Sequence, residues 1–441
     1  MTVLVLGAGV TGESFAAALR RLEPDVEIAL VEQELVGGEC SYWACIPSKT
    51  LLRPLEVFHR ARFAPGAAEG LGSVDVQRVF WWRDEVAGKD DTSQVEWVDK
   101  LRVELVRGSA GVVAPGQVRV GDRELAYDRL MVATGSVPVA PPIEGLDGLG
   151  YWTSRDATSA SEVPRRLVIL GGGAVGCELA QFYARLGSRV ALVQNGQHIL
   201  PRVDSEAAEI LEQALTEDGV ELHLGAQANA VEGGAGHYRL QLEGRESLEG
   251  THLLVATGRR PNADGLGLEQ LGVEIGRQGI TTDDRLRAAD GVWAAGDVTG
   301  VALFTHLGKY QARVAAADVA GREVRADYRA IPAAVFTDPQ VASVGDVSGD
   351  GAVVSRYPVE KVSRAATFRY PKQAGLVKLF ADPARKVLVG AVAVGPEAGE
   401  WIGQLTLAIR AEIPIDVLRD TIQPFPTFSE AIFFAARDLD L

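Results

Sequence analysis

Two copies of one glycine pattern constrain the fold of this chain more than any other feature. The first copy, GAGVTG, follows the apolar run VLVL and leads through a helical stretch into EIALVE. The second copy, GGGAVG, follows LVIL and leads through a helical stretch into RVALVQ. A buried strand, a glycine-rich turn and a helix in this order are typical of a dinucleotide-binding βαβ unit. We therefore expect two such units and two bound dinucleotides.

The glycines of each copy have separate mechanical roles. In chain order they allow a tight turn, let backbone approach a pyrophosphate, and let the helix pack closely against the strand. The positive N-terminus of the helix then faces the phosphates. These residues are Gly7, Gly9 and Gly12 in the first copy and Gly171, Gly173 and Gly176 in the second.

The two copies differ at the residue that ends their second strand. Glu32 ends it in the first copy, where a carboxylate can accept hydrogen bonds from both ribose hydroxyls. Gln194 ends it in the second, and a neutral amide neither demands those hydroxyls nor repels a 2′-phosphate. We therefore expect the second site to bind a nicotinamide cofactor, NADH or NADPH. We favour a site that accepts both forms. A trailing strand closes each half, LMVATGSVP at 130–138 and LLVATGRRP at 253–261.

Composition narrows the class of protein further. A chain of 441 residues should divide into two to four domains. The net charge of −15 argues against a nucleic-acid partner, and no apolar run is long enough to span a membrane. Because the chain opens directly on a strand, we expect a cytoplasmic protein without a signal peptide.

Two of the three cysteines, Cys40 and Cys45, lie close together and are followed at once by PSK. Three cysteines are too few for a structural disulfide framework, so a catalytic pair is favoured. Two buried, apolar cysteines are the alternative.

With these features the chain resembles the FAD-dependent pyridine nucleotide–disulfide oxidoreductases, the group of glutathione reductase, dihydrolipoamide dehydrogenase and mercuric reductase. The shared motifs are both glycine patterns, the cysteines before PSK, VWAAGD at 292–297 and IPAAVFTDPQVASVG at 331–345. The resemblance covers nearly the whole chain and implies an α/β fold with two Rossmann-like domains and an α+β C-terminal dimerisation domain. The implied limits are 1–145 and 265–325 for the FAD domain, 146–264 for the NAD(P) domain and 326–441 for the dimerisation domain.

The resemblance also implies cofactors and roles for single residues. FAD would occupy the first site and NADH or NADPH the second. Asp297 would bind the ribitol of FAD. Lys49 and Glu178 would lie beside the isoalloxazine ring. The alternative for Lys49 is a solvated surface lysine. Further cofactor contacts are expected at Gly38, Thr134, Gly135, Gly258 and Gly296.

The implied route takes hydride from NAD(P)H to FAD and then electrons to the Cys40–Cys45 disulfide. Cys45 would face the flavin as a thiolate, and Cys40 would meet the substrate. Pro47 favours a helix start here, whose dipole would stabilise a thiolate. The family is an obligate homodimer, because the C-terminal domain of one subunit completes the active site of the other.

The chain departs from the family near its end. Disulfide reductases of this type carry His-Pro-Thr-x-x-Glu, whereas this chain reads FPTFSE, with Phe425 at the histidine position and Glu430 retained. A positioned general acid–base contributes about 10²–10⁴-fold to a rate, so ordinary disulfides should react slowly. In carrying phenylalanine at this position, the chain is similar to 2-ketopropyl-coenzyme M oxidoreductase/carboxylase. We therefore expect a small-molecule acceptor such as a quinone or another electrophile. The alternatives are a low-molecular-weight disulfide reductase, like dihydrolipoamide dehydrogenase or mycothione reductase, working without the histidine, and a catalytically weak flavoprotein sensor or scaffold.

Other departures surround the cysteines. The loop carries Glu39, Tyr42, Trp43 and Ala44, where relatives have smaller residues. One interpretation is that these aromatic residues form a wall for a flat acceptor, to which Trp81 and Trp82 could add. The other interpretation is that they pack in the core. No cysteine follows Cys177, which argues against mercuric reductase chemistry. We expect Cys177 to be a small packed residue and His306 to be structural or catalytic.

Overall fold

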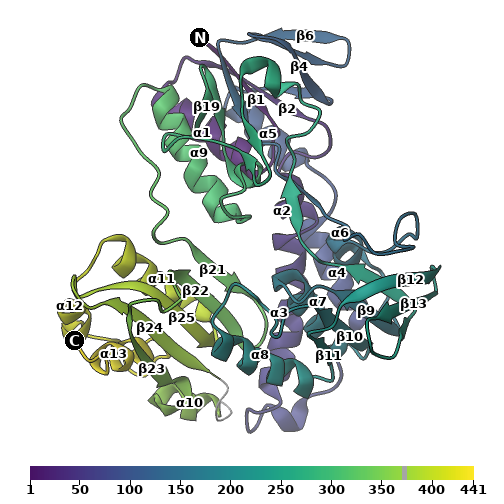
Figure 1. Ribbon diagram of the computed structural model, residues 1–441, viewed down its shortest axis with the longest axis vertical. Helices are drawn as coiled ribbons and strands as arrows, with labels where there is room; N and C mark the ends of the chain where they lie inside the picture. The colour runs from purple at the N-terminus through teal and green to yellow at the C-terminus, as the bar shows by residue number, and fades with distance from the viewer. Residues whose placement is uncertain (370–374) are drawn as a thin grey trace. The chain divides into compact units, whose positions relative to one another are not determined.

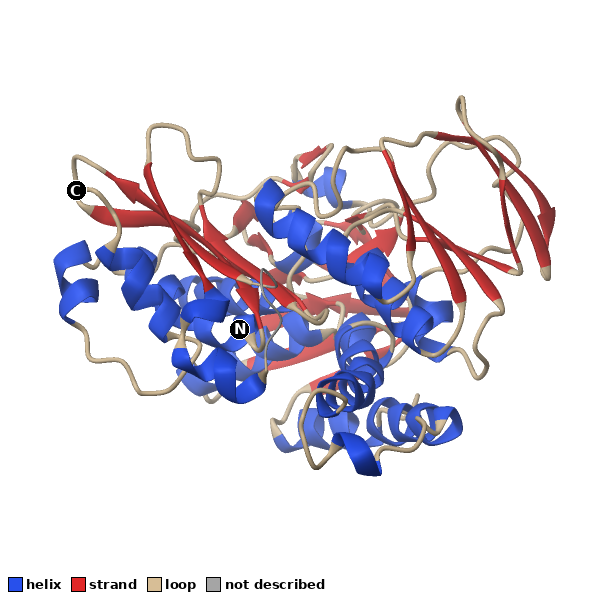
Figure 2. Ribbon diagram, turned by 90° about the horizontal axis from the view of Figure 1, so that it is seen from below, coloured by secondary structure: helices blue, strands red, loops and turns tan. Residues whose placement is uncertain are grey.

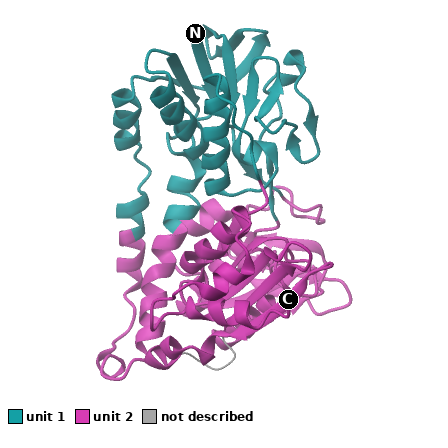
Figure 3. Cartoon of the chain, turned by 90° about the vertical axis from the view of Figure 1, so that its left-hand side faces the viewer, with its two compact units in different colours: residues 1–47, 83–139, 258–327 teal, residues 48–82, 140–257, 328–441 magenta. Residues whose placement is uncertain are grey.

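The computed structural model describes residues 1–369 and 375–441, which divide into two compact units (Figure 3). Each unit is built from three stretches of the chain. Unit 1 comprises Met1–Pro47, Arg83–Val139 and Gly258–Asp327, and unit 2 comprises Ser48–Trp82, Ala140–Thr257 and Tyr328–Leu441. The division into three domains that the sequence suggests stays a prediction.

Unit 1 is organised around a six-stranded sheet, in the order β19-β20-β7-β1-β2-β3. All neighbouring strands are parallel except β19, which runs antiparallel to β20. The bounds are β1 Thr2–Leu6, β2 Glu27–Glu32, β3 Glu104–Arg107, β7 Arg129–Val132, β19 Arg287–Ala289 and β20 Val292–Ala294.

Alternating side chains of β1 pack into two cores, one on each face of this sheet. Val3 and Val5 pack against helices, whereas Leu4 and Leu6 pack against a three-stranded antiparallel sheet. The helices α1 and α9 lie side by side on the first face (Figure 1). The bounds are α1 Val10–Leu22, α5 Thr92–Lys100, α9 Thr305–Val319, β4 Ala110–Ala114, β5 Gln117–Val120 and β6 Arg123–Ala126.

Unit 2 repeats this plan with a four-stranded parallel sheet, in the order β11-β10-β9-β15. Helices α3, α7 and α8 share the core on one face, and a three-stranded antiparallel sheet covers the other. The bounds are α3 Cys45–Ala61, α7 Ala174–Arg185, α8 Ser205–Glu217, β9 Arg166–Leu170, β10 Arg189–Gln194, β11 Glu221–Leu224, β12 Ala228–Gly234, β13 His237–Leu242, β14 Leu248–Gly250 and β15 His252–Val255.

A five-stranded antiparallel sheet, in the order β21-β22-β25-β24-β23, completes unit 2 (Figure 2). Helices α11, α12 and α13 pack on one face, and residues of the other face join the core of α3 and α7. The bounds are β21 Pro332–Val335, β22 Gln340–Gly345, β23 Val353–Pro358, β24 Leu376–Asp382, β25 Val387–Gly395, α11 Ala398–Arg410, α12 Ile415–Asp420 and α13 Glu430–Arg437.

Shorter elements connect these layers. They are α2 Gly38–Tyr42, α4 Val76–Ala87, α6 Ser154–Ser159, α10 Ser363–Phe368, β8 Ser136–Pro138, β16 Arg259–Pro261, β17 Ile275–Gly276, β18 Gly279–Ile280 and four short 3-10 helices, of which Gly296–Thr299 bears on the site. Among the described helices none is long and apolar enough to cross a membrane. The expected mixed α/β fold with paired nucleotide-binding units is confirmed, and the cytoplasmic location stays a prediction.

The third glycine of each pattern fixes how the helix meets its strand. A Cβ atom on Gly12 would overlap the carbonyl oxygen of Gly7, and one on Gly176 would overlap the carbonyl oxygen of Gly171. A side chain at either position would push the helix off the strand that it packs against.

We expect Gly176→Ala to lower the free energy of unfolding by about 1–3 kcal/mol, because the added methyl group meets backbone. Gly173→Ala is the matched control, since a Cβ there meets nothing within 4 Å. Its free energy of unfolding should change by less than about 1 kcal/mol. Urea denaturation without added NAD(P)H measures both, and equal losses would contradict the proposed steric role.

Candidate active site

The first glycine turn has the backbone geometry and the acid that a dinucleotide requires. Gly7 has a φ of 96°, which favours glycine, and Gly9 caps the N-terminus of α1. Glu32 stands at the end of β2, where one carboxylate oxygen accepts a hydrogen bond from the Ala8 N–H at 2.9 Å. The carboxylate is therefore held beside the turn, where the ribose next to a bound pyrophosphate would lie.

The second turn repeats this geometry with a neutral side chain. Gly171 has a φ of 106°, and Gly173 caps the N-terminus of α7. The buried Gln194 at the end of β10 accepts a hydrogen bond from the Gly172 N–H through Oε1 at 3.0 Å. The amide thus takes the place of the Glu32 carboxylate without its charge.

The residues after β7 form a second cluster at the carboxyl edge of the unit 1 sheet. Thr134 donates a hydrogen bond to the Asn262 carbonyl, and the Asn262 N–H donates to the Gly135 carbonyl at 2.9 Å. Gly135 has a φ of 73° and Gly258 a φ of 138°, so both turns require glycine. These loops border the region where a nucleotide binds in open α/β sheets.

Asp297 belongs to a chain of polar contacts that reaches the cysteine loop. Ser136 donates to Asp297 Oδ2 at 2.7 Å, Arg259 Nε donates to Ser136 Oγ at 2.8 Å, and Arg259 Nη1 lies 3.3 Å from Glu39 Oε1. Burial raises the pKa of Asp297, and the Ser136 hydrogen bond opposes that shift. Glu39, which the sequence marks as unusual, therefore ties the cysteine loop to the cofactor side of unit 1.

Cys40 and Cys45 form a disulfide, with Cys40 in the short helix α2 and Cys45 as the first residue of α3. The Thr305 hydroxyl donates to Cys40 Sγ at 3.2 Å and lies 3.3 Å from Cys45 Sγ. A helix N-terminus and a hydroxyl donor both favour a thiolate, so the surroundings suit a redox-active pair.

A cavity of about 490 Å³ opens beside Cys40 within unit 1. Sequence reasoning missed the residues that border it, because α1 and α9 meet only in the folded chain. They include Glu13, Arg21, Trp97, Thr305, Lys309 and Arg313. The space beside Cys40 is therefore framed by one carboxyl group, one indole and three cationic side chains.

Lys49 is a fixed residue rather than a solvated surface lysine. Its ammonium group donates to both carboxylate oxygens of Glu178, at 2.8 and 3.0 Å. The Glu178 side chain is 6% exposed and also accepts the Phe336 N–H at 2.9 Å. The Phe336 ring centroid lies 4.7 Å from the ammonium group. The pair predicted from the sequence is thus assembled, and its role beside a flavin stays a prediction.

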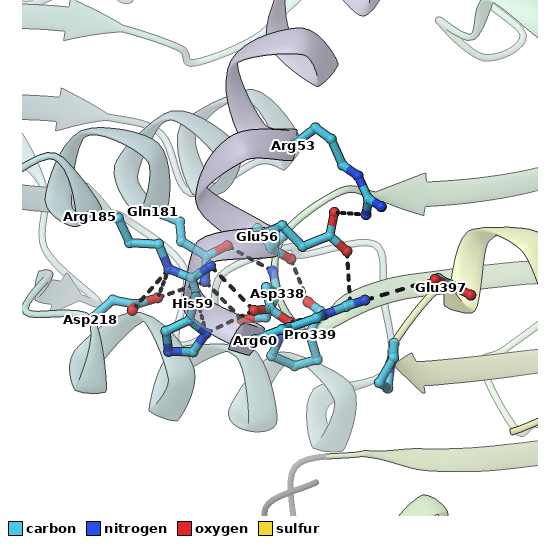
Figure 4. Close-up of polar contacts among 12 residues, drawn as sticks. Arg53, Glu56, His59, Arg60, Gln181, Arg185, Asp218, Asp338, Pro339 and Glu397 are labelled. Atoms are coloured by element: carbon cyan, nitrogen blue, oxygen red, sulfur yellow. Dashed lines mark hydrogen bonds and ion pairs between the residues drawn. The ribbon is translucent and has the colours of Figure 1, made fainter. Parts of the chain in front are cut away.

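A polar cluster around Asp338 holds the segment that carries Phe336 (Figure 4). The Asp338 N–H donates to Gln181 Oε1 at 2.7 Å, and its carboxylate contacts His59 at 3.0 Å and Arg185 at 3.3 Å. Burial works to raise the pKa of Asp338, but the His59 hydrogen bond and the nearby guanidinium groups outweigh it and hold the pKa below its ordinary value. The cluster therefore fixes the backbone that supports Glu178.

The family models for the pyridine nucleotide-disulphide oxidoreductases match residues 1–323, and the model for their dimerisation domain matches residues 331–436. The chain belongs to this family. It is an FAD-dependent oxidoreductase with a pyridine nucleotide as its second cofactor, a redox disulfide at Cys40–Cys45 and a domain that supports a homodimer.

Its relatives include two kinds of characterised enzyme. A dihydrolipoyl dehydrogenase of Thermus scotoductus is 35% identical over 99% of this chain and 97% of its own length, and a mercuric reductase of Lysinibacillus sphaericus is 31% identical over 99% and 82%. Among solved structures, LpdA of Mycobacterium tuberculosis has a TM-score of 0.89 at 28% identity, covering 99% of both chains. The HOCl-induced flavoprotein disulfide reductase RclA of Escherichia coli, as its Cu(II) complex, has a TM-score of 0.87 at 26% identity, over 99% of this chain and 98% of its own.

Of the two interpretations of the aromatic residues in the cysteine loop, packing in the core holds for Tyr42 and Trp43. Tyr42 is 4% exposed and Trp43 is 8% exposed, and the Tyr42 hydroxyl donates to the Val36 carbonyl at 2.9 Å. These rings pack in the core because the five-residue helix α2 turns them inward. Trp81 and Trp82 are surface residues of α4 instead.

The remaining predicted residues divide between packing and surface. Cys177 is buried with its thiol directed to the Gly172 carbonyl, so the expected packing role is confirmed. His306 stacks on the Phe304 ring with centroids 5.1 Å apart. Phe425 is 73% exposed in the single chain, and Glu430, the first residue of α13, accepts the Thr427 N–H.

We expect Asp338→Asn to lower the free energy of unfolding by about 3–5 kcal/mol at neutral pH, because it removes a largely buried carboxylate that pairs with Arg185 and Arg60. Asp350→Asn, at an exposed position of unit 2, should change it by less than about 0.5 kcal/mol.

The pH dependence follows from the sign of the Asp338 shift. Because folding depresses this pKa, the stabilisation is fully present above the unfolded value of about 3.9 and is lost as pH falls through the folded value. The difference between wild type and Asp338→Asn in denaturant titrations should therefore shrink below about pH 4. A difference that persists unchanged in acid would contradict this account.

Proposed function

We propose that this enzyme passes electrons from NAD(P)H through FAD to the Cys40–Cys45 disulfide, and on to a quinone or another electrophile that enters the cavity beside Cys40. One observation carries the proposal. Cys40 borders a cavity of its own unit, whereas the C-terminal motif presents Phe425 where the family's disulfide reductases have a histidine. An aromatic ring cannot exchange protons with a leaving thiolate.

The residues of this chain have separate tasks in that scheme. FAD, when bound, supplies the two-electron step between nicotinamide and disulfide. Lys49, fixed by Glu178, supplies a positive charge for the reduced cofactor. Thr305 and the N-terminus of α3 stabilise the thiolate form of the reduced pair. Cys40, which borders the cavity, would be the sulfur that meets the acceptor.

The cavity lining supports a flat acceptor with oxygen atoms that gain charge. Trp97 and Ile46 are 38% and 44% exposed there and offer apolar contact to a ring. Lys309 and Arg313 offer positive charge to carbonyl oxygens that become negative during reduction. A quinone combines these two properties.

Two alternatives remain as outcomes of the experiments. The first alternative is reduction of a small disulfide, and the similarity to RclA, which is described as a disulfide reductase, supports disulfide reduction. A sensor or scaffold with weak catalysis is opposed by the assembled disulfide and by the Lys49–Glu178 pair.

We expect quinones to be reduced at least about 10-fold faster than glutathione-, mycothiol- or lipoamide-type disulfides, because Trp97 offers apolar contact to a flat ring and Lys309 and Arg313 stabilise charge on its oxygen atoms. Steady-state assays with each acceptor measure the ratio. Cys40→Ala should abolish quinone reduction, because the proposed route passes through the disulfide. Phe425→His should raise disulfide turnover. Equal turnover of disulfides and quinones by the wild type would refute the proposed acceptor.

An anaerobic titration with NADPH separates the sensor alternative from the enzyme. In the proposed enzyme a long-wavelength thiolate-to-flavin absorbance should develop at two-electron reduction in the wild type. Cys45→Ser is the control that removes it. A wild type that lacks this band would show that the cysteine relay does not work.

We further propose that the second site accepts both NADH and NADPH, supported by the neutral Gln194 beside the glycine turn. The values of kcat/KM for the two cofactors should lie within about 10-fold, because no carboxylate repels a 2′-phosphate. Gln194→Glu should then disfavour NADPH. A preference of the wild type above 100-fold for either form would contradict the proposal.

A further inference from the structure

Any two-electron reduction at Cys40 needs a source of protons. The Thr305 side chain, which contacts both sulfur atoms, does not supply one, because its hydroxyl is far too weak an acid at neutral pH. Phe425 has no titratable proton, and His306 is not among the residues that border the cavity. The donor must therefore be sought in the cavity itself.

The cavity holds one carboxyl group. Among the described residues that line it, Glu13 alone carries an acid side chain, and it borders the same space as Cys40. Glu13 lies in the first turn of α1, directly after Gly12, and is partly buried. Its position is thus fixed by the glycine turn and does not depend on a flexible loop.

We propose that Glu13 is the general acid for the reaction at Cys40. This inference rests on the proposed function, because it requires an acceptor that reacts with the Cys40 sulfur. It assigns to a residue of α1 the proton transfer that the histidine performs elsewhere in the family.

The proton and electron balance can be written for a disulfide probe, RSSR. The Cys40 thiolate attacks one sulfur, a Cys40–SR bond forms, the S–S bond of the probe breaks, and the leaving thiolate takes the Glu13 proton to give RSH. The Cys45 thiolate then attacks the Cys40 sulfur, restores the Cys40–Cys45 disulfide and releases the second thiolate. That thiolate takes a proton through Glu13 after solvent has reprotonated it. A quinone consumes the same two electrons and two protons to give a hydroquinone.

The surroundings keep the proton on Glu13 near neutral pH. Burial raises its pKa to about 7. The positive charge of Lys309 acts to lower this pKa, and the negative charge of Glu32 acts to raise it. The other charged groups that border the cavity are Arg21 of α1 and Arg313 of α9. A pKa near the operating pH lets a general acid both give up and regain its proton.

Single-turnover oxidation of the reduced holoenzyme by two disulfide probes tests the inference. Hydroxyethyl disulfide releases a strongly basic alkyl thiolate that needs a proton, whereas dithiobis(nitrobenzoate) releases an aromatic thiolate that leaves without one. We expect Glu13→Gln to slow the alkyl probe by about 10²-fold or more and the aromatic probe by less than about threefold. Glu85→Gln, which changes an exposed carboxyl group of α4, should slow neither.

The pH profile gives a second readout. The wild-type rate with the alkyl probe should fall as pH rises through about 7, because Glu13 then loses its proton. Glu13→Gln should lack this fall, and Glu13→Asp should restore part of the rate together with the fall. These results would support the inference.

Three results would overturn it. Equal slowing of both probes by Glu13→Gln would show a structural role, and no slowing of either would show no role. Equal rates for wild type and Cys40→Ala would refute the proposed function and this inference with it. Because Cys40→Ala is measured separately, a failure of Glu13 alone is distinguishable from a failure of the whole scheme.

Discussion

The backbone contact inside each glycine turn is the constraint on which the rest of this structure depends. Gly12 and Gly176 leave no room for a side chain between helix and strand, so α1 and α7 start at fixed points against their sheets. Glu13 comes one residue after Gly12, and Glu178 comes two residues after Gly176. The turns that shape the nucleotide sites therefore also position the Glu13 and Glu178 carboxyl groups.

These two carboxyl groups have opposite electrostatic surroundings. Both oxygens of Glu178 accept hydrogen bonds from Lys49, and one also accepts a backbone N–H. These hydrogen bonds hold the Lys49 ammonium group in place. The pKa of Glu13 is instead raised by burial, which leaves its proton available for exchange. The same local motif thus provides a fixed charge in one half of the chain and a titratable acid in the other.

The sequence was sufficient for features that depend on local spacing. Both glycine turns, the Cys40–Cys45 pair at a helix start and the class of fold follow from patterns within a few residues or from repetition of a pattern. The Lys49–Glu178 contact joins residues 129 positions apart and came from the family resemblance rather than from spacing. It could be foreseen because the motifs that carry both residues are specific.

The sequence was insufficient where side chains meet through packing of separate helices. The cavity beside Cys40 forms between residues of α1, α2, α5 and α9, and its acid, Glu13, has no motif of its own. Tyr42 and Trp43 left two interpretations open for the same reason. A bulky residue next to a reactive cysteine reads as a substrate contact, but the turn of a five-residue helix decides whether its ring faces the cavity or the core.

In the proposed scheme, Phe425 at the expected histidine position changes where proton transfer is controlled. The resemblance to the family implies that the imidazole would come from the C-terminal domain of the partner subunit, so reactivity at the disulfide would depend on assembly of the dimer. Here Cys40, Thr305 and Glu13 all belong to unit 1 of a single chain. In the proposed scheme, a subunit carries its own proton donor beside its own disulfide. In the same scheme Phe425 of the dimerisation domain is an apolar ring that has no proton to give. That arrangement favours an acceptor whose shape fits the cavity beside Cys40 over one whose reduction requires an imidazole.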